Sequence, residues 1–182
     1  MEEAMFASFQ KAVFKKVAEQ LKLRFPHRSL ELVYPDDLIL QDLDFLKTNN
    51  KLLWNAGIKS RIFTDLNESH PIKLVVYYRG EPIGYAFGGF NQELQSVEVG
   101  WMEKRNDAHE DLDHQMLGIV LDAYSAYALF LNAQGHQVNT IAMVSPVEGA
   151  KRYYLESNFA FDGNYKNGAS AMILTRATNV DE

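Results

Sequence analysis

An almost unbroken series of apolar residues between positions 116 and 131 constrains the fold of this chain more than any other segment. These residues occupy nearly every side of a helix instead of one stripe, and such a helix must be covered on nearly every side. We therefore expect a long, buried helix that ends at Gly135 and needs other elements packed around it. Its apolar positions are Met116, Leu117, Ile119, Val120, Ala123, Tyr124, Tyr127, Leu129, Phe130 and Leu131.

The segments before and after this helix have the composition of β-strands. Runs rich in Val, Ile, Tyr and Phe are separated by Gly, Pro and Asn, which favour turns. The turn Gly80-Glu81-Pro82 between the first two runs predicts a hairpin. The expected strands are residues 72–78, 83–87, 95–102, 140–144, 159–161 and 171–174, with a short helix at 150–157.

The N-terminal part of the chain is predominantly helical by its periodicity. Apolar residues three and four apart predict an amphipathic helix that ends near Phe25, before Pro26. Its apolar face consists of Phe6, Phe9, Val13, Val17 and Leu21. After it we expect a strand at 29–34, then helices at 38–46 and 49–56, the second capped by Gly57.

The composition excludes several classes of protein. The chain has 182 residues, a net charge of −6 and no cysteine, so it has no disulfide, thiol nucleophile or cysteine-held metal. It lacks the basic surface that nucleic acid binding requires. The acidic start and the absence of an apolar run of about 18 residues predict a cytoplasmic protein that is not a membrane partner. Neither a phosphate-binding G-x-x-x-x-G-K loop nor a G-x-S-x-G nucleophile motif occurs.

Four segments in order resemble the GNAT superfamily of acetyl-coenzyme-A-dependent N-acetyltransferases. They are the hairpin at 80–85, the run Val97-Glu98-Val99-Gly100-Trp101-Met102, the segment 115–120, and Ala150, Tyr154 and Phe159 at the spacing of the family's last motif. The resemblance covers residues 29–175. It implies a GNAT-like α/β (α+β) fold, a mixed and mostly antiparallel sheet flanked by helices. We therefore divide the chain into an additional N-terminal helix, 1–28, and an acyltransferase domain, 29–182.

The resemblance also implies a site for acetyl-CoA. In the family, the pantetheine arm lies between the fourth and fifth strands, and the pyrophosphate lies on backbone N–H groups at the start of the long helix. The family's loop "[RQ]-x-x-G-x-[GA]" is partly degenerate here, with Val120 at the second small position and acidic residues before it. The cofactor-binding residues that the resemblance implies are Met102, Lys104, Gln115, Leu117, Gly118, Val120 and Ser145.

Two residues correspond to the family's catalytic groups. Glu98 is the candidate base for the acceptor amine, and Tyr154 is the candidate acid for the leaving thiolate. Each has a structural alternative: Glu98 could lie on a solvated sheet face, and Tyr154 could pack a short helix into the core. Gly118 could instead serve close helix packing, and Asp113 could be the N-cap of the long helix.

No metal site is expected. His109 and His114 are five residues apart, which does not place them on one helical face. The other histidines, His27, His70 and His136, are isolated in the sequence and expected at the surface.

The expected function is transfer of an acetyl or other acyl group from coenzyme A to an amine of a small molecule or peptide. The acidic net charge favours a cationic acceptor. The alternative is a catalytically inactive GNAT-fold interaction protein that no longer binds acetyl-CoA. Tyr77, Tyr78 and Tyr85 could then contribute to a partner or homodimer surface, or simply pack within the sheet.

Overall fold

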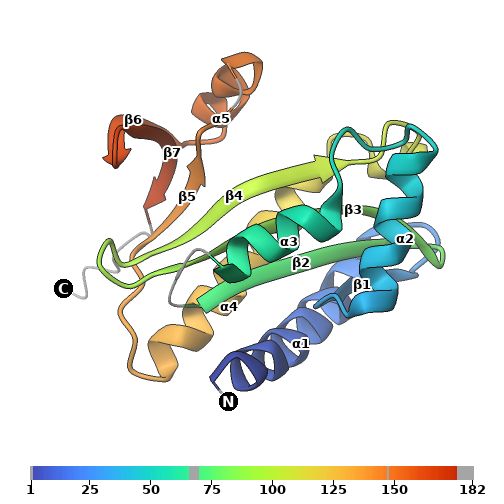
Figure 1. The fold of residues 1–182 in the computed structure, drawn as a ribbon, viewed down its shortest axis with the longest axis horizontal. Helices are drawn as coiled ribbons and strands as arrows, with labels where there is room; N and C mark the ends of the chain where they lie inside the picture. Colours follow the sequence, from blue (N-terminus) through green and yellow to red (C-terminus); the bar gives the residue numbers. More distant parts are fainter. Residues whose placement is uncertain (1, 66–69, 147, 176–182) are drawn as a thin grey trace.

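A single seven-stranded sheet forms the centre of the computed structural model, which describes residues 2–65, 70–146 and 148–175. The strand order is β1-β2-β3-β4-β5-β7-β6 (Figure 1). The strands are β1 (Leu30–Val33), β2 (His70–Tyr78), β3 (Glu81–Asn91), β4 (Ser96–Lys104), β5 (Thr140–Val144), β6 (Ala160–Lys166) and β7 (Ala169–Thr175). The helices are α1 (Glu2–Leu21), α2 (Asp37–Thr48), α3 (Ala56–Asp65), α4 (Met116–Ala133) and α5 (Lys151–Glu156).

All neighbouring strands are antiparallel except β4 and β5, which are parallel. Helix α4 connects these two strands, as a parallel pair requires. The expected mixed, mostly antiparallel sheet with flanking helices and an additional N-terminal helix is therefore confirmed.

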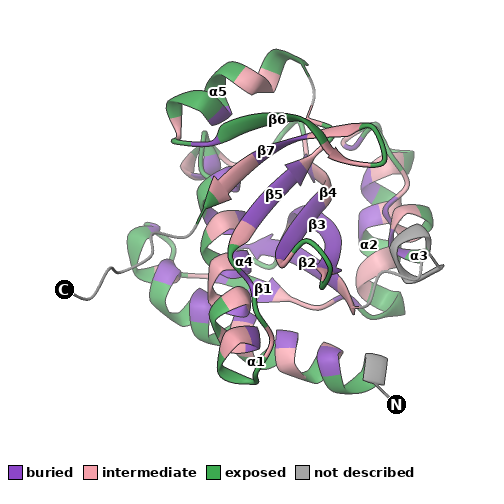
Figure 2. Ribbon diagram, turned by 90° about the vertical axis from the view of Figure 1, so that its left-hand side faces the viewer, coloured by how far each residue is buried: buried purple, intermediate pink, exposed green. Residues whose placement is uncertain are grey.

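Alternate residues of the central strands fill two separate cores. On one face, α1 and α4 cover Ile72, Leu74 and Val76 of β2. On the other face, α2 and the start of α3 cover Val75 and Tyr77. Figure 2 shows the resulting pattern, with the middle strands buried and α5 and β6 largely exposed.

Helix α4 is the main covering element, as its sequence predicts. Eight of its residues are buried, and the Tyr124 hydroxyl donates a hydrogen bond to the Ala86 carbonyl oxygen at 3.1 Å. The sequence contains no long run of purely apolar residues, yet α4 has the length and composition of a membrane-crossing helix. In the fold it is a core helix lying against the sheet.

Helix α1 is fixed to the sheet by a buried glutamine that the apolar pattern does not reveal. The Gln10 side chain donates to the Pro71 carbonyl oxygen at 2.8 Å and accepts from the Lys73 amide at 3.0 Å. Phe14 and Leu21 join the same core as α4. The N-terminal helix therefore packs on the sheet of its own chain.

Several expected boundaries are wrong. Residues 49–55 form a connecting loop instead of the helix expected at 49–56, and Gly57 lies in the first turn of α3 instead of capping a helix. The Asn55 side chain begins α3 by accepting a hydrogen bond from the Ile58 amide at 2.8 Å. The last two strands form a longer hairpin than expected. Tyr77, Tyr78 and Tyr85 are buried, so they do not form a partner surface.

Candidate functional site

Strands β4 and β5 separate halfway along β4. They pair only from Ser96 with Thr140 to Val99 with Met143, and β4 then continues to Lys104 paired with β3 but not with β5 (Figure 1). The β3–β4 register shifts at the same level, between Phe87 and Gly88. Backbone hydrogen-bonding groups on the facing edges of the two strands are thereby separated, and an extended ligand can pair with such edges.

Glycine is required where β3 meets this part of β4. A Cβ on Gly88 would lie 1.7 Å from the Glu98 carbonyl oxygen, closer than any side chain can approach. The β5 strand turns away at Ser145, which has a φ of 49° and whose amide donates to the Ser170 carbonyl oxygen at 2.8 Å. The backbone geometry of β3 at Gly88 and of the chain at the end of β5 therefore maintains the separation of β4 from β5.

A cavity of about 410 Å³ occupies the space between the separated strands. Its walls come from the loop before α3, from β4, from the end of β5 and from the start and middle of α5. The lining residues are Trp54, Val99, Gly100, Trp101, Met102, Met143, Val144, Ser145, Pro146, Ala150 and Tyr154. Of the predicted site residues, the cavity brings together Met102, Ser145 and Tyr154.

Tyr154 presents a proton donor to this cavity. The residue is 7% exposed, and its ring packs against Phe159 with ring centroids 5.4 Å apart. Burial raises the pKa of its hydroxyl, and the nearby Tyr153 raises it further. Among the described residues the hydroxyl has no hydrogen-bond partner. A protonated phenol at the wall of a cavity can donate to a ligand there.

Two tryptophans border the cavity on the α2 and α3 side of the sheet, and a lysine contacts one of them. The rings of Trp54 and Trp101 are perpendicular with centroids 5.5 Å apart. The ammonium of Lys59, on α3, lies 3.4 Å from the centroid of the Trp101 ring. The face of Trp101 therefore already stabilises one cation.

A buried carboxylate, Glu103, fixes the loop that carries Trp54. It accepts hydrogen bonds from the amides of Leu53 and Trp54 and, at 2.9 Å, from the Tyr85 hydroxyl. Burial and the Glu103 charge raise the pKa of that tyrosine, so it remains a donor. Neither Trp54 nor Glu103 was among the predicted site residues, and Trp54 lay in a segment expected to be a helix, 49–56. The alternation of Trp101 and Glu103 along β4 is the signal that could have placed Glu103 on this face.

Glu98 does not line the cavity. Its side chain is buried and forms an ion pair with Lys166 at 2.7 Å. It also accepts hydrogen bonds from Tyr165 at 2.6 Å and Asn91 at 3.2 Å. The alternative of a solvated sheet face is therefore wrong. The carboxylate connects β4 to the end of the β6–β7 hairpin, on the sheet face that α2 and α3 cover.

At the start of α4, some residues are buried in the core and others are exposed to solvent. Leu117 and Val120 are buried in the core, so the Val120 side chain does not crowd the outside of the loop. Gly118 is exposed, and a Cβ there would meet no atom within 4 Å, so the packing alternative for this glycine is also wrong.

No side chain caps the first turn of α4. Gln115 is the N-cap, and it makes no side-chain capping hydrogen bond, while Asp113 ends the preceding 3-10 turn, Glu110–Leu112, instead of capping α4. The amides of a first helical turn have no acceptor within the helix. Lys104 lies nearby and donates to the Leu112 carbonyl oxygen at 3.4 Å. The exposed side of this turn can therefore accept an anion.

A scan against protein-family models finds no match for this chain, and a search of curated proteins finds none. Solved structures of acetyltransferases do match it. PaiA N-acetyltransferase from Thermoplasma acidophilum, in complex with coenzyme A, has a TM-score of 0.51 and 12% identity, covering 81% of this chain and 99% of its own.

Two further matches have similar extents. The acetyltransferase MccE, which confers self-immunity to microcin C7 and is in complex with acetyl-CoA and AMP, has a TM-score of 0.52 and 16% identity over 81% of this chain and 92% of its own. The spermidine/spermine N-acetyltransferase SpeG from Vibrio cholerae, in mutant forms, has a TM-score of 0.51 and 17% identity over 81% and 95%. The chain thus has the fold of the GNAT acetyltransferases, as the sequence resemblance implied.

Proposed function

We propose that this protein is an acetyl-CoA-dependent N-acyltransferase. The observation that carries the proposal is the cavity between β4 and β5, which opens where the two parallel strands separate and which Tyr154 borders. Acetyl-CoA would supply an activated acyl group there. Related folds in complex with coenzyme A or acetyl-CoA support this choice of cosubstrate.

Different parts of the chain suit different parts of this cosubstrate. The free backbone edges near Gly100 and Val144 suit the amides of a pantetheine arm. The uncapped first turn of α4 suits the phosphates, with Gly118 leaving its outer side open. Among the other predicted cofactor residues, Leu117 and Val120 could contribute only their backbone, since their side chains lie in the core.

In the transfer, an uncharged amine attacks the thioester carbonyl carbon, a C–N bond forms and the C–S bond breaks. Tyr154 donates a proton to the departing sulfur, since burial keeps its hydroxyl protonated. Glu98 is the proposed base, which accepts the proton that the nitrogen loses, at a distance and through Tyr165, to which its carboxylate is hydrogen-bonded at 2.6 Å. A Glu98→Gln variant tests this role by its pH profile, because a purely structural role predicts no change in the pH dependence of kcat.

The acceptor is proposed to be a cationic amine. The net charge of −6 favours the approach of cations. The Lys59 ammonium over Trp101 marks a place where an ammonium group is stabilised beside the cavity. A solved structure of similar fold is named as a spermidine/spermine N-acetyltransferase. Polyamines and lysine-containing peptides are therefore the first acceptors to try.

The experiment is an acceptor screen that measures free thiol released from acetyl-CoA. Wild-type protein is compared with Ala150→Phe, which places a ring in the cavity, and with Leu155→Phe, which adds a ring at an exposed position on the same short helix. We expect acceptor-dependent thiol release by wild-type and Leu155→Phe, and loss of release in Ala150→Phe. Equal rates in all three proteins would refute the cavity as the site of transfer.

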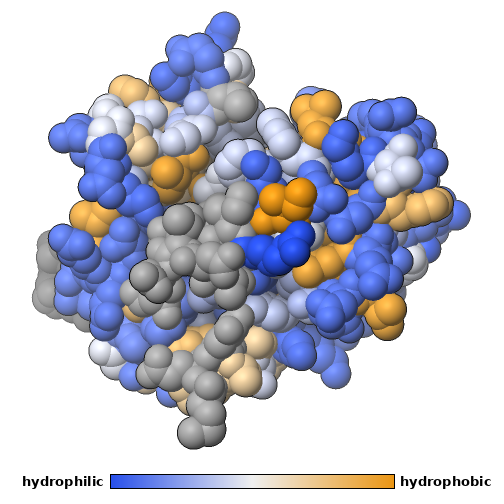
Figure 3. Space-filling model, viewed as in Figure 1, coloured by the Kyte–Doolittle hydropathy of each residue, from blue (hydrophilic) through white to orange (hydrophobic). Residues whose placement is uncertain are grey.

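One observation favours the alternative of an inactive interaction protein. Exposed apolar side chains gather on α2, α3 and the loop between them, with Leu38 71%, Phe45 68%, Leu53 72% and Ile58 49% exposed. Figure 3 shows, however, that apolar groups on the visible face lie among hydrophilic ones instead of forming one continuous area. Large continuous patches are the better indicator of a protein interface.

A further inference from the structure

Two histidines and an aspartate that are distant in the sequence meet beside the start of α4. His27 lies between α1 and β1, while His109 and Asp111 belong to the loop between β4 and α4. One potential ligand atom from each lies within 4.8 Å of the other two. The Asp111 Oδ2 atom is 3.3 Å from His109 Nδ1 and 3.8 Å from His27 Nε2. His27 is exposed at the surface, as expected, but it is not isolated in the fold.

The imidazole of His109 contacts Asp111 in two ways. The Asp111 amide donates to Nδ1 of His109 at 3.1 Å. The same nitrogen lies 3.3 Å from Asp111 Oδ2. Because an imidazole nitrogen has one lone pair, a metal ion bound at Nδ1 would replace the hydrogen bond from the amide and would be shared with the carboxylate.

A tyrosine supports the cluster from behind. The Tyr78 hydroxyl donates to Asp111 Oδ2 at 2.7 Å and accepts from the His27 amide at 3.4 Å. Metal-binding carboxylates and histidines are commonly oriented by such outer hydrogen bonds.

We propose that His27, His109 and Asp111 bind one divalent transition-metal ion of the zinc class. Two imidazoles and one carboxylate favour Zn²⁺ over Mg²⁺ or Ca²⁺, which prefer oxygen ligands. Metal–ligand distances of about 2.0–2.2 Å place tetrahedral ligand atoms roughly 3.3 Å apart, so the cluster needs only small side-chain movements to close around the ion.

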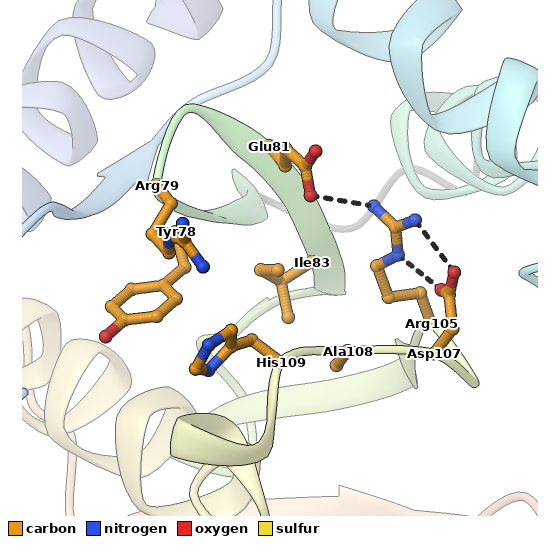
Figure 4. Close-up of a pocket in the computed structure, with 8 residues that line it drawn as sticks. All are labelled: Tyr78, Arg79, Glu81, Ile83, Arg105, Asp107, Ala108 and His109. Atoms are coloured by element: carbon orange, nitrogen blue, oxygen red, sulfur yellow. Dashed lines mark hydrogen bonds and ion pairs between the residues drawn. The ribbon is translucent and has the colours of Figure 1, made fainter. Parts of the chain in front are cut away.

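The site has room for a fourth ligand. His27, His109 and Asp111 have side chains that are 44%, 31% and 16% exposed, which leaves access for water. Figure 4 shows His109 beside Tyr78 at one end of a hollow of about 170 Å³, while Arg105 is paired with Glu81 and Asp107 at the other end. No arginine of this hollow forms an ion pair with Asp111 among the described contacts.

Bound metal would join the segment after α1 to the loop before α4. It would close a chain loop from residue 27 to residue 109, and a cross-link of that length stabilises the folded state. This inference does not depend on the proposed acyl transfer, because the cluster shares no residue with the cavity between β4 and β5.

The test is calorimetric titration of chelator-treated protein with Zn²⁺ alone. We expect one ion per chain, and a weakening of at least about tenfold in His27→Gln and in Asp111→Asn. His114→Gln is the matched control, an exposed histidine in the same loop but outside the cluster, and it should bind as wild-type. Co²⁺ should give the visible absorption of a four-coordinate site in wild-type and lose it in His27→Gln.

Two results would overturn the proposal. One is the absence of Zn²⁺ binding at about 100 µM metal, a concentration far above that needed for a three-ligand protein site. This outcome would mean that the three side chains contact one another without holding a metal ion. The other is binding that His27→Gln and Asp111→Asn leave unchanged while His114→Gln weakens it, which would place the ion elsewhere in the loop.

Discussion

A substitution at Gly118 distinguishes an effect on stability from an effect on the binding of acetyl-CoA. A Cβ at this exposed position would meet no atom within 4 Å, and alanine is about 1 kcal/mol better than glycine inside a helix. We expect Gly118→Ala to raise the free energy of unfolding by about 0.5–1 kcal/mol. If phosphates approach the first turn of α4, the same variant should bind acetyl-CoA about tenfold more weakly. Urea denaturation and calorimetry measure the two effects, and higher stability with unchanged affinity would exclude this turn as the phosphate site.

Removing the hydroxyl oxygen of Tyr154 tests whether this residue acts as the acid. Tyr154→Phe keeps the ring that packs on Phe159 and should lower kcat about 100-fold. Because burial raises its pKa above the usual value of 10, the hydroxyl stays protonated through neutral and moderately alkaline pH. Wild-type kcat should therefore show no decline from this group below about pH 10.

Tyr153 provides the control for this substitution. It precedes Tyr154 on α5 and is 45% exposed, so Tyr153→Phe should leave kcat unchanged. A similar loss of kcat in both variants would assign the effect to the packing of the helix instead of to proton donation.

At the scale of elements, ion pairs attach the segment after β4 to its surroundings. Arg105 bonds to Asp107 at 2.7 Å, and Lys51 contacts the same carboxylate at 3.1 Å. The hydrogen bond from Arg105 is the largest cause that lowers the Asp107 pKa to about 2. This lowered pKa implies stability that is present above the ordinary pKa near 4 and is lost as the pH falls through about 2.

Asp107→Asn should remove that pH-dependent contribution. Because the side chain is 40% exposed and solvent screens it, we expect a loss below about 1 kcal/mol at pH 6. The difference from wild-type should shrink between about pH 4 and pH 2 in urea denaturation at a series of pH values. Asp113→Asn, which changes an exposed residue of the same segment, is the control variant. A difference that stays constant with pH would contradict this assignment.

The strands and the long helix could be predicted from local periodicity, whereas the loop that carries Trp54 could not. The apolar spacing of α4 and the β-rich runs of β2 and β3 identify elements whose own residues decide their conformation. Residues 52–54 are also apolar and were assigned to a helix, but Glu103 holds their backbone in a loop through the Leu53 and Trp54 amides. That constraint comes from a strand far along the chain, so local sequence does not contain it.

The same distinction applies to the two sites. Tyr154, Ser145 and Met102 were identified from a resemblance, and the fold brings them to one cavity. The histidine cluster was missed because His27 is remote in sequence from His109, and only the packing of α1 against the sheet brings them together. Glu98 was placed on the correct strand, while its partners Tyr165 and Lys166 follow from the pairing of the last hairpin.

At the scale of the whole molecule, the charges of the protein have two opposing effects on the binding of the proposed cosubstrate, acetyl-CoA. The chain carries a net charge of −6, which repels a polyanion at long range. The uncapped start of α4 and the nearby Lys104 attract one at short range. Salt of about 0.15 M screens interactions beyond roughly 8 Å, so it reduces the long-range repulsion more than the local contacts. Binding of acetyl-CoA should therefore persist at moderate salt.

The most direct measurement is calorimetric titration of the wild-type protein with acetyl-CoA, at low and at moderate salt, beside Ala150→Phe and Leu155→Phe. The account predicts one acetyl-CoA per chain for wild-type and Leu155→Phe, and at least about tenfold weaker binding for Ala150→Phe. Absence of heat and of any thermal shift at millimolar acetyl-CoA, or equal binding by all three proteins, would contradict the assignment of the cavity between β4 and β5 as the cosubstrate site.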